Sequence, residues 1–272
     1  MKTKKSLKYV LAIIVLIVVN GCSSLEIVSK WQQDSLTIDG SKKDWENNLQ
    51  YIKDEKVAVG ITNDNNNLYL CLVVSDNMRI MRILKSGLTI WIDPKNSDGE
   101  KIGIQYPIKN RASSVRDFSK NFKNIDQKER QKKIFNKLIL EQNEFVVLNE
   151  DEYPLFASPI NKGSDGIELK MNYEYNQLVY ELKIPLTGKD NLLKINPKTD
   201  KKIRLGFITG KLEYPSNARQ KMGGGMAGGQ RGGGMSGGGR RGGMAGRGGM
   251  QGMRSGGIEG LNFWVNAIIA SK

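Results

Sequence analysis

The most constraining feature of this sequence is a pair of alternating apolar runs joined by an asparagine-rich turn. From Val57 to Ile61 every second residue is branched and apolar, and the same period of two recurs from Leu68 to Val74. This period places the apolar side chains on one face of a strand. Residues 63–67 between the runs are Asn and Asp, which tolerate the left-handed backbone of turns. The pattern predicts a β-hairpin with one buried face, to which further strands add.

The N-terminal segment is typical of a bacterial lipoprotein precursor. Four lysines precede an uncharged run over 9–19, which is too short to span a bilayer but typical of a signal peptide. The run leads into Val-Asn-Gly-Cys, which resembles a lipobox whose cysteine, here Cys22, is acylated and becomes the first mature residue. We expect a signal peptide over 1–21, a lipid-anchored tether over 22–30, and localisation at the outer membrane, on its periplasmic face or at the cell surface. The alternative is an uncleaved helix followed by an internal cysteine.

Composition excludes several kinds of chemistry. The formal charge of +14 falls to +10 when the four N-terminal lysines are removed, so part of the basicity belongs to targeting. The chain has no histidine, which excludes Ser/His and Cys/His catalysis and histidine-ligated zinc or haem. Once Cys22 is acylated, Cys71 has no partner for an intramolecular disulfide and is interpreted as a core residue.

Further strand motifs follow a recognisable order. Leu36–Ile38 is expected to be a short strand, followed by a turn at Gly40 and a helical turn at Trp45. After the asparagine-rich hairpin, the runs 87–94 and 101–107 predict a second hairpin. Later strands are predicted over 144–150, 166–173, 178–186, 203–214 and 261–270.

These motifs together resemble the family 9 carbohydrate-binding modules and their relatives in the DOMON-like superfamily. The resemblance rests on Ile38-Asp39-Gly40, Asp44-Trp45, the Asn-Asp and Leu-Tyr hairpin, and the strand that ends in Glu181-Leu-Lys-Ile-Pro. The hairpin pair and the Gly-rich segment are also similar to those of a group of uncharacterised lipoproteins of Gram-negative bacteria. The resemblance implies an antiparallel β-sandwich over residues 31–272 that binds and does not catalyse.

Calcium and haem are ligands of some modules that this sequence resembles, and the residues present favour neither. Structural calcium could be held by Asp93–Glu100, but proline and lysine occupy the second and third positions of that segment, so a plain turn is the preferred interpretation. Haem would need Met or Lys axial ligands, because histidine is absent. Paired catalytic carboxylates are the remaining possibility, yet no spacing brings two of the candidate acids together. We therefore expect no cofactor and no enzymatic activity. The candidate acids are Asp39, Asp44, Asp64, Asp76, Asp93 and Glu181.

Two segments interrupt the strands. Residues 114–142 show apolar positions three and four apart on either side of a polar, basic run, which predicts one or two inserted helices packed on the sheet. Residues 222–257 consist almost wholly of Gly, Met and Arg, a composition that cannot bury enough apolar surface to order itself, so a disordered loop is predicted. An RNA-binding role for this loop is disfavoured because it lacks aromatic residues. Its arginines disfavour a methionine copper(I) site.

The candidate ligand site is predicted from the alternation of side chains along each strand, in which every second residue lies on the same face. On one side of each strand the alternate residues are apolar, and this side is assigned to the core between two sheets. The residues on the other side of the strands combine flat aromatic rings with planar hydrogen-bonding groups, which is the combination that sugars require. The predicted site residues are Tyr69, Trp91, Gln105, Glu181, Arg204, Trp264 and Asn266.

Two functions remain open at this point. The first is a carbohydrate-binding lipoprotein of the cell envelope whose partner is a glycan and not a nucleic acid. The second is a structural or assembly lipoprotein that contacts an outer-membrane protein through its sandwich and its Gly-rich loop. An open aromatic sheet face favours the first function, and a face closed by the chain's own helices favours the second.

Overall fold

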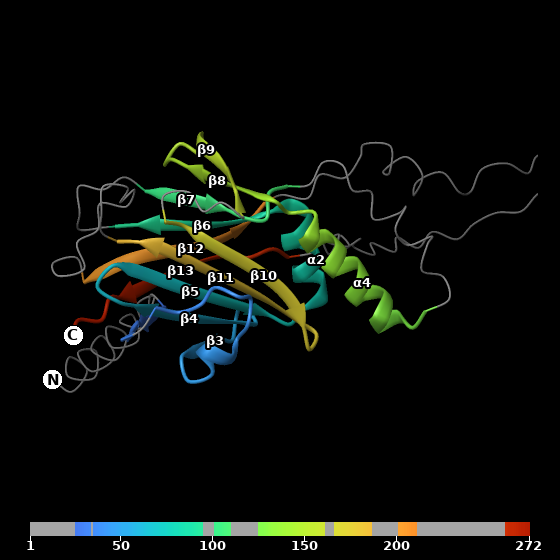
Figure 1. Cartoon of the computed structure of the whole chain (residues 1–272), viewed down its shortest axis with the longest axis horizontal. Coiled ribbons are helices and arrows are strands. Elements are labelled where there is room, and N and C mark those ends of the chain that lie inside the picture. Colours follow the sequence, from blue (N-terminus) through green and yellow to red (C-terminus); the bar gives the residue numbers. More distant parts are fainter. Residues whose placement is uncertain are drawn as a thin grey trace, which may run out of the picture.

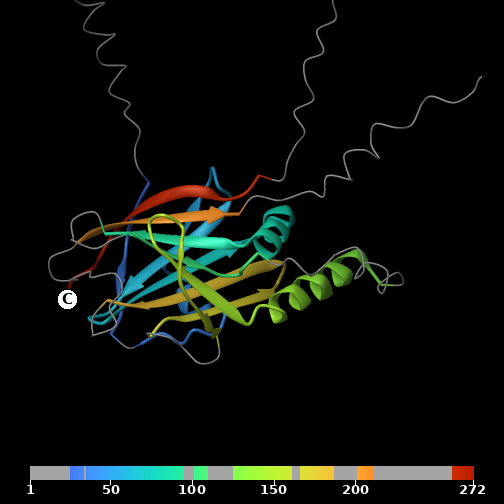
Figure 2. The same ribbon diagram turned by 90° about the horizontal axis from the view of Figure 1, so that it is seen from above.

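The computed structural model describes residues 25–33, 35–94, 101–109, 125–160, 166–186, 201–210 and 259–272. These residues form two β-sheets packed face to face, with helices at one end of the sandwich (Figure 1). Seen from above, the two sheets form separate layers (Figure 2). The predicted mainly β sandwich is confirmed.

One sheet has seven strands and the other has six. The seven-stranded sheet runs in the order β1 (Glu26–Val28), β13 (Asn262–Ile268), β12 (Lys202–Thr209), β6 (Leu88–Asp93), β7 (Ile102–Gln105), β8 (Glu144–Leu148) and β9 (Pro154–Pro159). The six-stranded sheet runs in the order β10 (Glu168–Glu174), β11 (Gln177–Pro185), β5 (Asn67–Val74), β4 (Val57–Asn63) and β2 (Lys30–Trp31), and β3 (Leu49–Ile52) also pairs with β4. Strands β4 and β5 are the predicted first hairpin, and β6 and β7 are the predicted second pair.

The N-terminal part of the described chain differs from the prediction. Residues expected to form a tether instead add β1 in parallel to β13 and β2 in parallel to β4, so the sheets are mixed rather than wholly antiparallel. The short strand predicted at Leu36–Ile38 is also wrong, because these residues form no strand. Their side chains instead pack on the outer face of the six-stranded sheet.

The core between the sheets contains the alternating positions that the sequence indicates. Leu68, Leu70, Leu72 and Val74 of β5 lie in one cluster with Ile90 and Ile92 of β6 and with Leu205 and Phe207 of β12. Phe207 stacks on Phe263 with ring centroids 4.8 Å apart and an interplanar angle of 9°. Burial of these side chains from both sheets is the main force that holds the layers together.

Two described helices close one end of the sandwich. Helix α2 (Asn77–Ser86), which the strand pattern does not predict, begins at Asp76, whose carboxylate accepts a hydrogen bond from the Arg79 N–H at 2.8 Å. Helix α4 (Gln127–Leu140) is the described part of the predicted insertion 114–142 and buries Phe135 and Leu138. Neither described helix is long and apolar enough to cross a membrane.

Several predicted segments lie outside the described residues. They include the signal peptide with Cys22, the turn at 95–100, the first part of the helical insertion, the end of the predicted strand 203–214, and the Gly-rich loop 222–257. Their assignments therefore stay predictions.

Candidate functional site

The outer face of the seven-stranded sheet carries a row of two tryptophans and two glycines. Trp264 lies opposite Gly206, Gly206 lies opposite Trp91, and Trp91 lies opposite Gly103, so the row crosses four adjacent strands. An added Cβ would lie 2.9 Å from the Trp91 ring at Gly103 and 2.8 Å from the Trp264 ring at Gly206. Each indole therefore occupies the space above the backbone of a glycine on the neighbouring strand.

Two cationic side chains lie over these rings. The Lys101 Nζ is 4.5 Å from the ring centroid of Trp91 and 5.6 Å from that of Trp264. The Arg204 guanidinium carbon is 4.8 Å from the centroid of Trp264. These distances are within the range of cation–π attraction, which contributes about 0.5–1 kcal/mol at exposed sites. Arg204 also forms an ion pair with Asp93, its cross-strand neighbour, at 3.3 Å.

The two tryptophans differ in accessibility. Trp91 is only 3% exposed, so its ring offers no free face to a ligand in this structure. Trp264 is partly exposed. The prediction that both rings are free to stack on a sugar is therefore wrong for Trp91, which is buried beneath the ammonium of Lys101. Trp264 keeps a partly exposed ring, although Arg204 and Lys101 also lie over it.

The amide residues of the predicted site lie on the same face. Asn266 is opposite Arg204, and Gln105 is two residues beyond Gly103, so both side chains leave the sheet on the side of the tryptophans. Both residues are partly exposed. We name this surface the Trp264 face. It consists of Trp91, Asp93, Lys101, Gln105, Arg204, Trp264 and Asn266.

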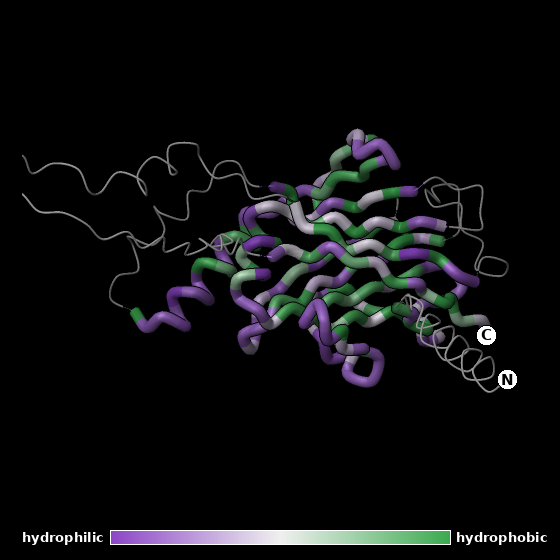
Figure 3. Tube along the Cα trace, turned by 180° about the vertical axis from the view of Figure 1, so that it is seen from behind, coloured by the Kyte–Doolittle hydropathy of each residue, from purple (hydrophilic) through white to green (hydrophobic). Residues whose placement is uncertain are grey.

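No described helix or loop crosses the Trp264 face. Figure 3 shows the strands of the seven-stranded sheet uncovered, with apolar and polar residues alternating along them. Helices α2 and α4 lie at the end of the sandwich and not over this sheet (Figure 2). Within the described part of the chain, the face is open.

Tyr69 and Glu181 are not part of this face, which corrects the prediction. Both belong to the six-stranded sheet and both are 0% exposed. The parity of a strand shows which residues share a side, but it does not show to which sheet the strand belongs. Residues 35–48 cover the outer side of the six-stranded sheet over β4, β5 and β11, and Trp45 belongs to a second apolar cluster there.

The buried Glu181 has a structural role. Its carboxylate accepts hydrogen bonds from the Trp45 Nε1–H at 2.7 Å and from the Gly40 N–H at 2.5 Å. Burial raises the pKa of Glu181, and the two hydrogen bonds oppose this shift. The Tyr69 hydroxyl donates to Asp64 at 2.7 Å, and burial with this contact raises the pKa of Tyr69. The Trp45 and Gly40 contacts fix the covering segment to the sheet, whereas the Tyr69–Asp64 contact joins β5 to its own turn.

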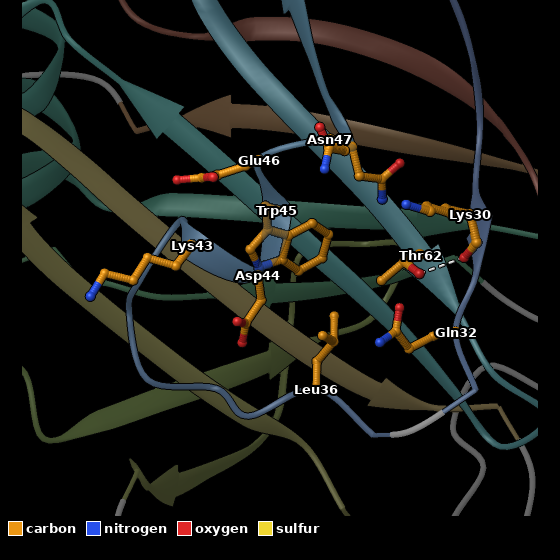
Figure 4. Close-up of a pocket in the computed structure, with 10 residues that line it drawn as sticks. Lys30, Gln32, Leu36, Lys43, Asp44, Trp45, Glu46, Asn47 and Thr62 are labelled. Atoms are coloured by element: carbon orange, nitrogen blue, oxygen red, sulfur yellow. Dashed lines mark hydrogen bonds between the residues drawn. The ribbon is translucent and has the colours of Figure 1, made fainter.

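A small hollow lies beside this covering segment (Figure 4). Its volume is about 120 Å³, and Trp45, Asp44, Gln32 and Thr62 are among the residues that line it. Ligand pockets usually enclose about 300–1,000 Å³. The hollow is therefore too small to take a sugar.

Metal and thiol chemistry receive no support from the described residues. Within them, no three Cys, Asp or Glu side chains are grouped as metal ligands. Residues 95–100 lie outside the described residues, so both the preferred plain turn and the alternative calcium site at Asp93–Glu100 stay untested. Burial raises the pKa of the Cys71 thiol well above its usual value, which disfavours the reactive thiolate.

Sequence reasoning missed Lys101, Gly103 and Gly206. Lys101 could have been found from the sequence, because it is two residues before Gly103 and four before Gln105 and is therefore expected on the same side of their strand. The glycines are recognised only when the strand pairing is known, since their role is to leave room for a tryptophan from the next strand.

Comparison with known proteins gives a limited result. No protein-family model matches the chain, and no curated protein matches it. One similar solved structure is a carbohydrate-binding module of family 9 from Caldicellulosiruptor kristjanssonii in complex with glucose. The similarity covers 71% of this chain and 81% of that chain at 12% identity, with a TM-score of 0.33. At this TM-score the similarity carries no functional argument, and function is inferred from the Trp264 face itself.

Proposed function

We propose that this protein is a non-catalytic glycan-binding lipoprotein of the cell envelope and that the Trp264 face is its binding surface. The N-terminal lysines, the apolar run and Cys22 support a lipid anchor in the outer membrane. The observation that carries the binding function is a partly exposed indole on an open sheet, next to cationic and amide side chains.

The chemistry of this face suits a sugar. The C–H groups of a sugar ring pack against an indole, while its hydroxyls need both donors and acceptors. Trp264 supplies the ring, Arg204 and Lys101 supply donors, and Gln105 and Asn266 supply both donors and acceptors. Since the glycine row lets the indoles lie against the backbone, the binding surface is shallow and suits an extended glycan rather than an enclosed small molecule.

A glycan array probed with the full-length protein in detergent tests this function. Wild-type protein is expected to retain at least one class of glycan, and Trp264→Ala is expected to lose it. Tyr51→Ala is a matched control because Tyr51 is 63% exposed on β3, in the other sheet. Equal retention by wild type and Trp264→Ala, or retention of no glycan by wild type, contradicts the proposal.

A role in envelope assembly is the second candidate, and the edge strand β9 favours it. Among the described strands, none pairs with the outer edge of β9. Leu155 in this strand is 49% exposed, and Tyr153 just before it is 68% exposed. An exposed edge with apolar side chains can add a strand from a partner protein. Loss of a crosslinked envelope partner in Leu155→Lys, with glycan retention absent in wild type, would favour this role.

A further inference from the structure

We propose that the glycan bound by the Trp264 face is acidic, and that Lys101 recognises its carboxylate or phosphate group. This inference rests on the proposed glycan-binding function and names the chemical class of the ligand. A neutral sugar needs no full positive charge at its site, yet two cations lie over the tryptophans of this face.

Lys101 is the residue best placed to receive an anion. Its Nζ lies near both indole rings, and no described carboxylate is within ion-pair distance of it. Elsewhere in the described sheets, Lys183 pairs with Glu168 and Lys202 pairs with Glu26, each at 2.7 Å. Lys101 thus has its positive charge held over aromatic rings and not neutralised by a described acid.

Arg204 adds a second donor group beside the same ring. Its Nη1 contacts Asp93 at 3.3 Å, and its guanidinium lies over Trp264. A guanidinium carries five N–H donors. The single contact with Asp93 fixes the orientation of Arg204 while other donors remain for a ligand. The charges of Lys101, Arg204 and Asp93 leave this part of the face with a net positive charge.

The position of Lys101 over the Trp91 ring gives the buried Trp91 a role. Because the Lys101 ammonium lies 4.5 Å from its ring, Trp91 acts as a positioning residue for the cation. Trp264 then stacks against the sugar ring, and Lys101 meets the acidic substituent at the edge of the same sugar. Hydrogen bonds between charged groups of this kind are about twice as strong as neutral ones.

Calorimetry with the full-length protein in detergent tests the inference. The probes are a galacturonic acid trisaccharide, galactose 6-phosphate, and the neutral galactose trisaccharide, each measured at low and at high salt. Wild-type protein is expected to bind an acidic probe at least tenfold more tightly than the neutral one, and salt is expected to reduce this difference. Because the two acidic probes differ in length, the larger fold-loss of affinity in Lys101→Gln, and not the lower Kd, identifies the group as a carboxylate or a phosphate.

Two substitutions distinguish recognition of the acidic group by Lys101 from a general effect of the protein's positive charge. Lys101→Gln is expected to abolish the preference for the acidic probe and to leave weak binding of the neutral trisaccharide. Lys202→Gln removes a lysine from the same sheet that lies in an exposed ion pair, and it is expected to keep the preference. Tight binding of the neutral probe without a preference for acid, or equal losses in the two variants, overturns the inference but not the proposed function. Absence of binding to all three probes overturns the inference, and retention of no glycan on the array overturns the proposed function as well.

Discussion

Trp45 donates its indole N–H to the carboxylate of Glu181 across 2.7 Å, and both side chains are fully buried on the outer side of the six-stranded sheet. The contact joins residues 136 positions apart. It closes one face of the sandwich with the chain's own N-terminal segment. Since this segment covers the centre of that face, the Trp264 face is the more open side of the described sandwich, which is why we propose it as the binding surface.

The first prediction concerns this contact. Trp45→Phe removes the N–H donor and keeps most of the ring, so we expect a loss of about 1–3 kcal/mol in unfolding free energy near neutral pH. The pKa of Glu181 is raised in the folded state, so its contribution to stability is present below its unfolded pKa and is lost as pH rises through its folded pKa. Removing a donor that favours the carboxylate should enlarge this loss.

Urea unfolding at about pH 4.5 and pH 8 measures the effect. The cost of Trp45→Phe should be larger at pH 8 than at pH 4.5. Trp31→Phe serves as the control, because Trp31 is partly exposed on β2. An equal cost at both pH values would show that the ring, and not the hydrogen bond to Glu181, is what matters.

The second prediction concerns the polar network that joins the end of β4 to the segments that follow β1 and β13. The Asn63 side chain is 0% exposed, accepts hydrogen bonds from the Ser29 hydroxyl and the Ala270 N–H, and donates to the Ala270 carbonyl. Asn63→Ala leaves buried partners unsatisfied and should lower the unfolding free energy by about 1–3 kcal/mol. Asn65→Ala in the exposed turn should change it by less than about 0.5 kcal/mol. Comparable melting temperatures for the two variants would contradict this role.

The sandwich was predictable because its strands carry a clear period of two. Leu68 to Val74 and Ile90 to Ile92 show by this period which residues face the core between the sheets. The prediction of a single buried face is wrong for β5, because its outward residues are also buried, in a second cluster with Trp45. Helix α2 was not predicted, since its ten residues follow a strand directly and its start is signalled only by Asp76.

The candidate site was only partly predictable, for a different physical reason. Trp91, Gln105, Arg204, Trp264 and Asn266 share a face because their strands are neighbours, and parity placed them on the correct side. Tyr69 and Glu181 have the same parity but belong to the other sheet. Sheet membership depends on contacts between distant strands, which the local pattern does not record.

The third prediction concerns the lipid anchor. If Cys22 is acylated, the full-length protein should incorporate radiolabelled palmitate and fractionate with the outer membrane. Cys22→Ser should lose the label and accumulate as unprocessed precursor. Cys71→Ser is the matched control, because Cys71 is buried in β5 and should have no effect on labelling. Equal labelling of wild type and Cys22→Ser would exclude the anchor.

The fourth prediction tests whether the glycine row shapes the Trp264 face. Gly206→Ala places a methyl group 2.8 Å from the Trp264 ring, so the indole must move off the backbone. We expect at least a tenfold weaker affinity for the glycan and a shift in tryptophan fluorescence. Gly166→Ala is the control. It is also strained, because Gly166 has a φ of +72°, but its added Cβ meets only Pro185 of β11, at 3.3 Å, in the other sheet. Unchanged glycan affinity in Gly206→Ala would mean that the ring position is not important.

The last prediction separates stability from binding within the same pair of strands. Phe207 is 1% exposed and faces the core, whereas the partly exposed Trp264 on β13 faces outward. Phe207→Ala removes a stacked core ring and should cost about 3–5 kcal/mol. Trp264→Ala should cost only about 1–2 kcal/mol, because less of its surface is removed from water on folding. Affinity should follow the opposite order: Trp264→Ala should abolish glycan binding, while the fraction of Phe207→Ala that remains folded should bind with the wild-type Kd. Chemical unfolding and calorimetry on the same preparations give both quantities. A large stability loss in Trp264→Ala would show that its ring is a packing element of the sheet rather than a ligand-binding group.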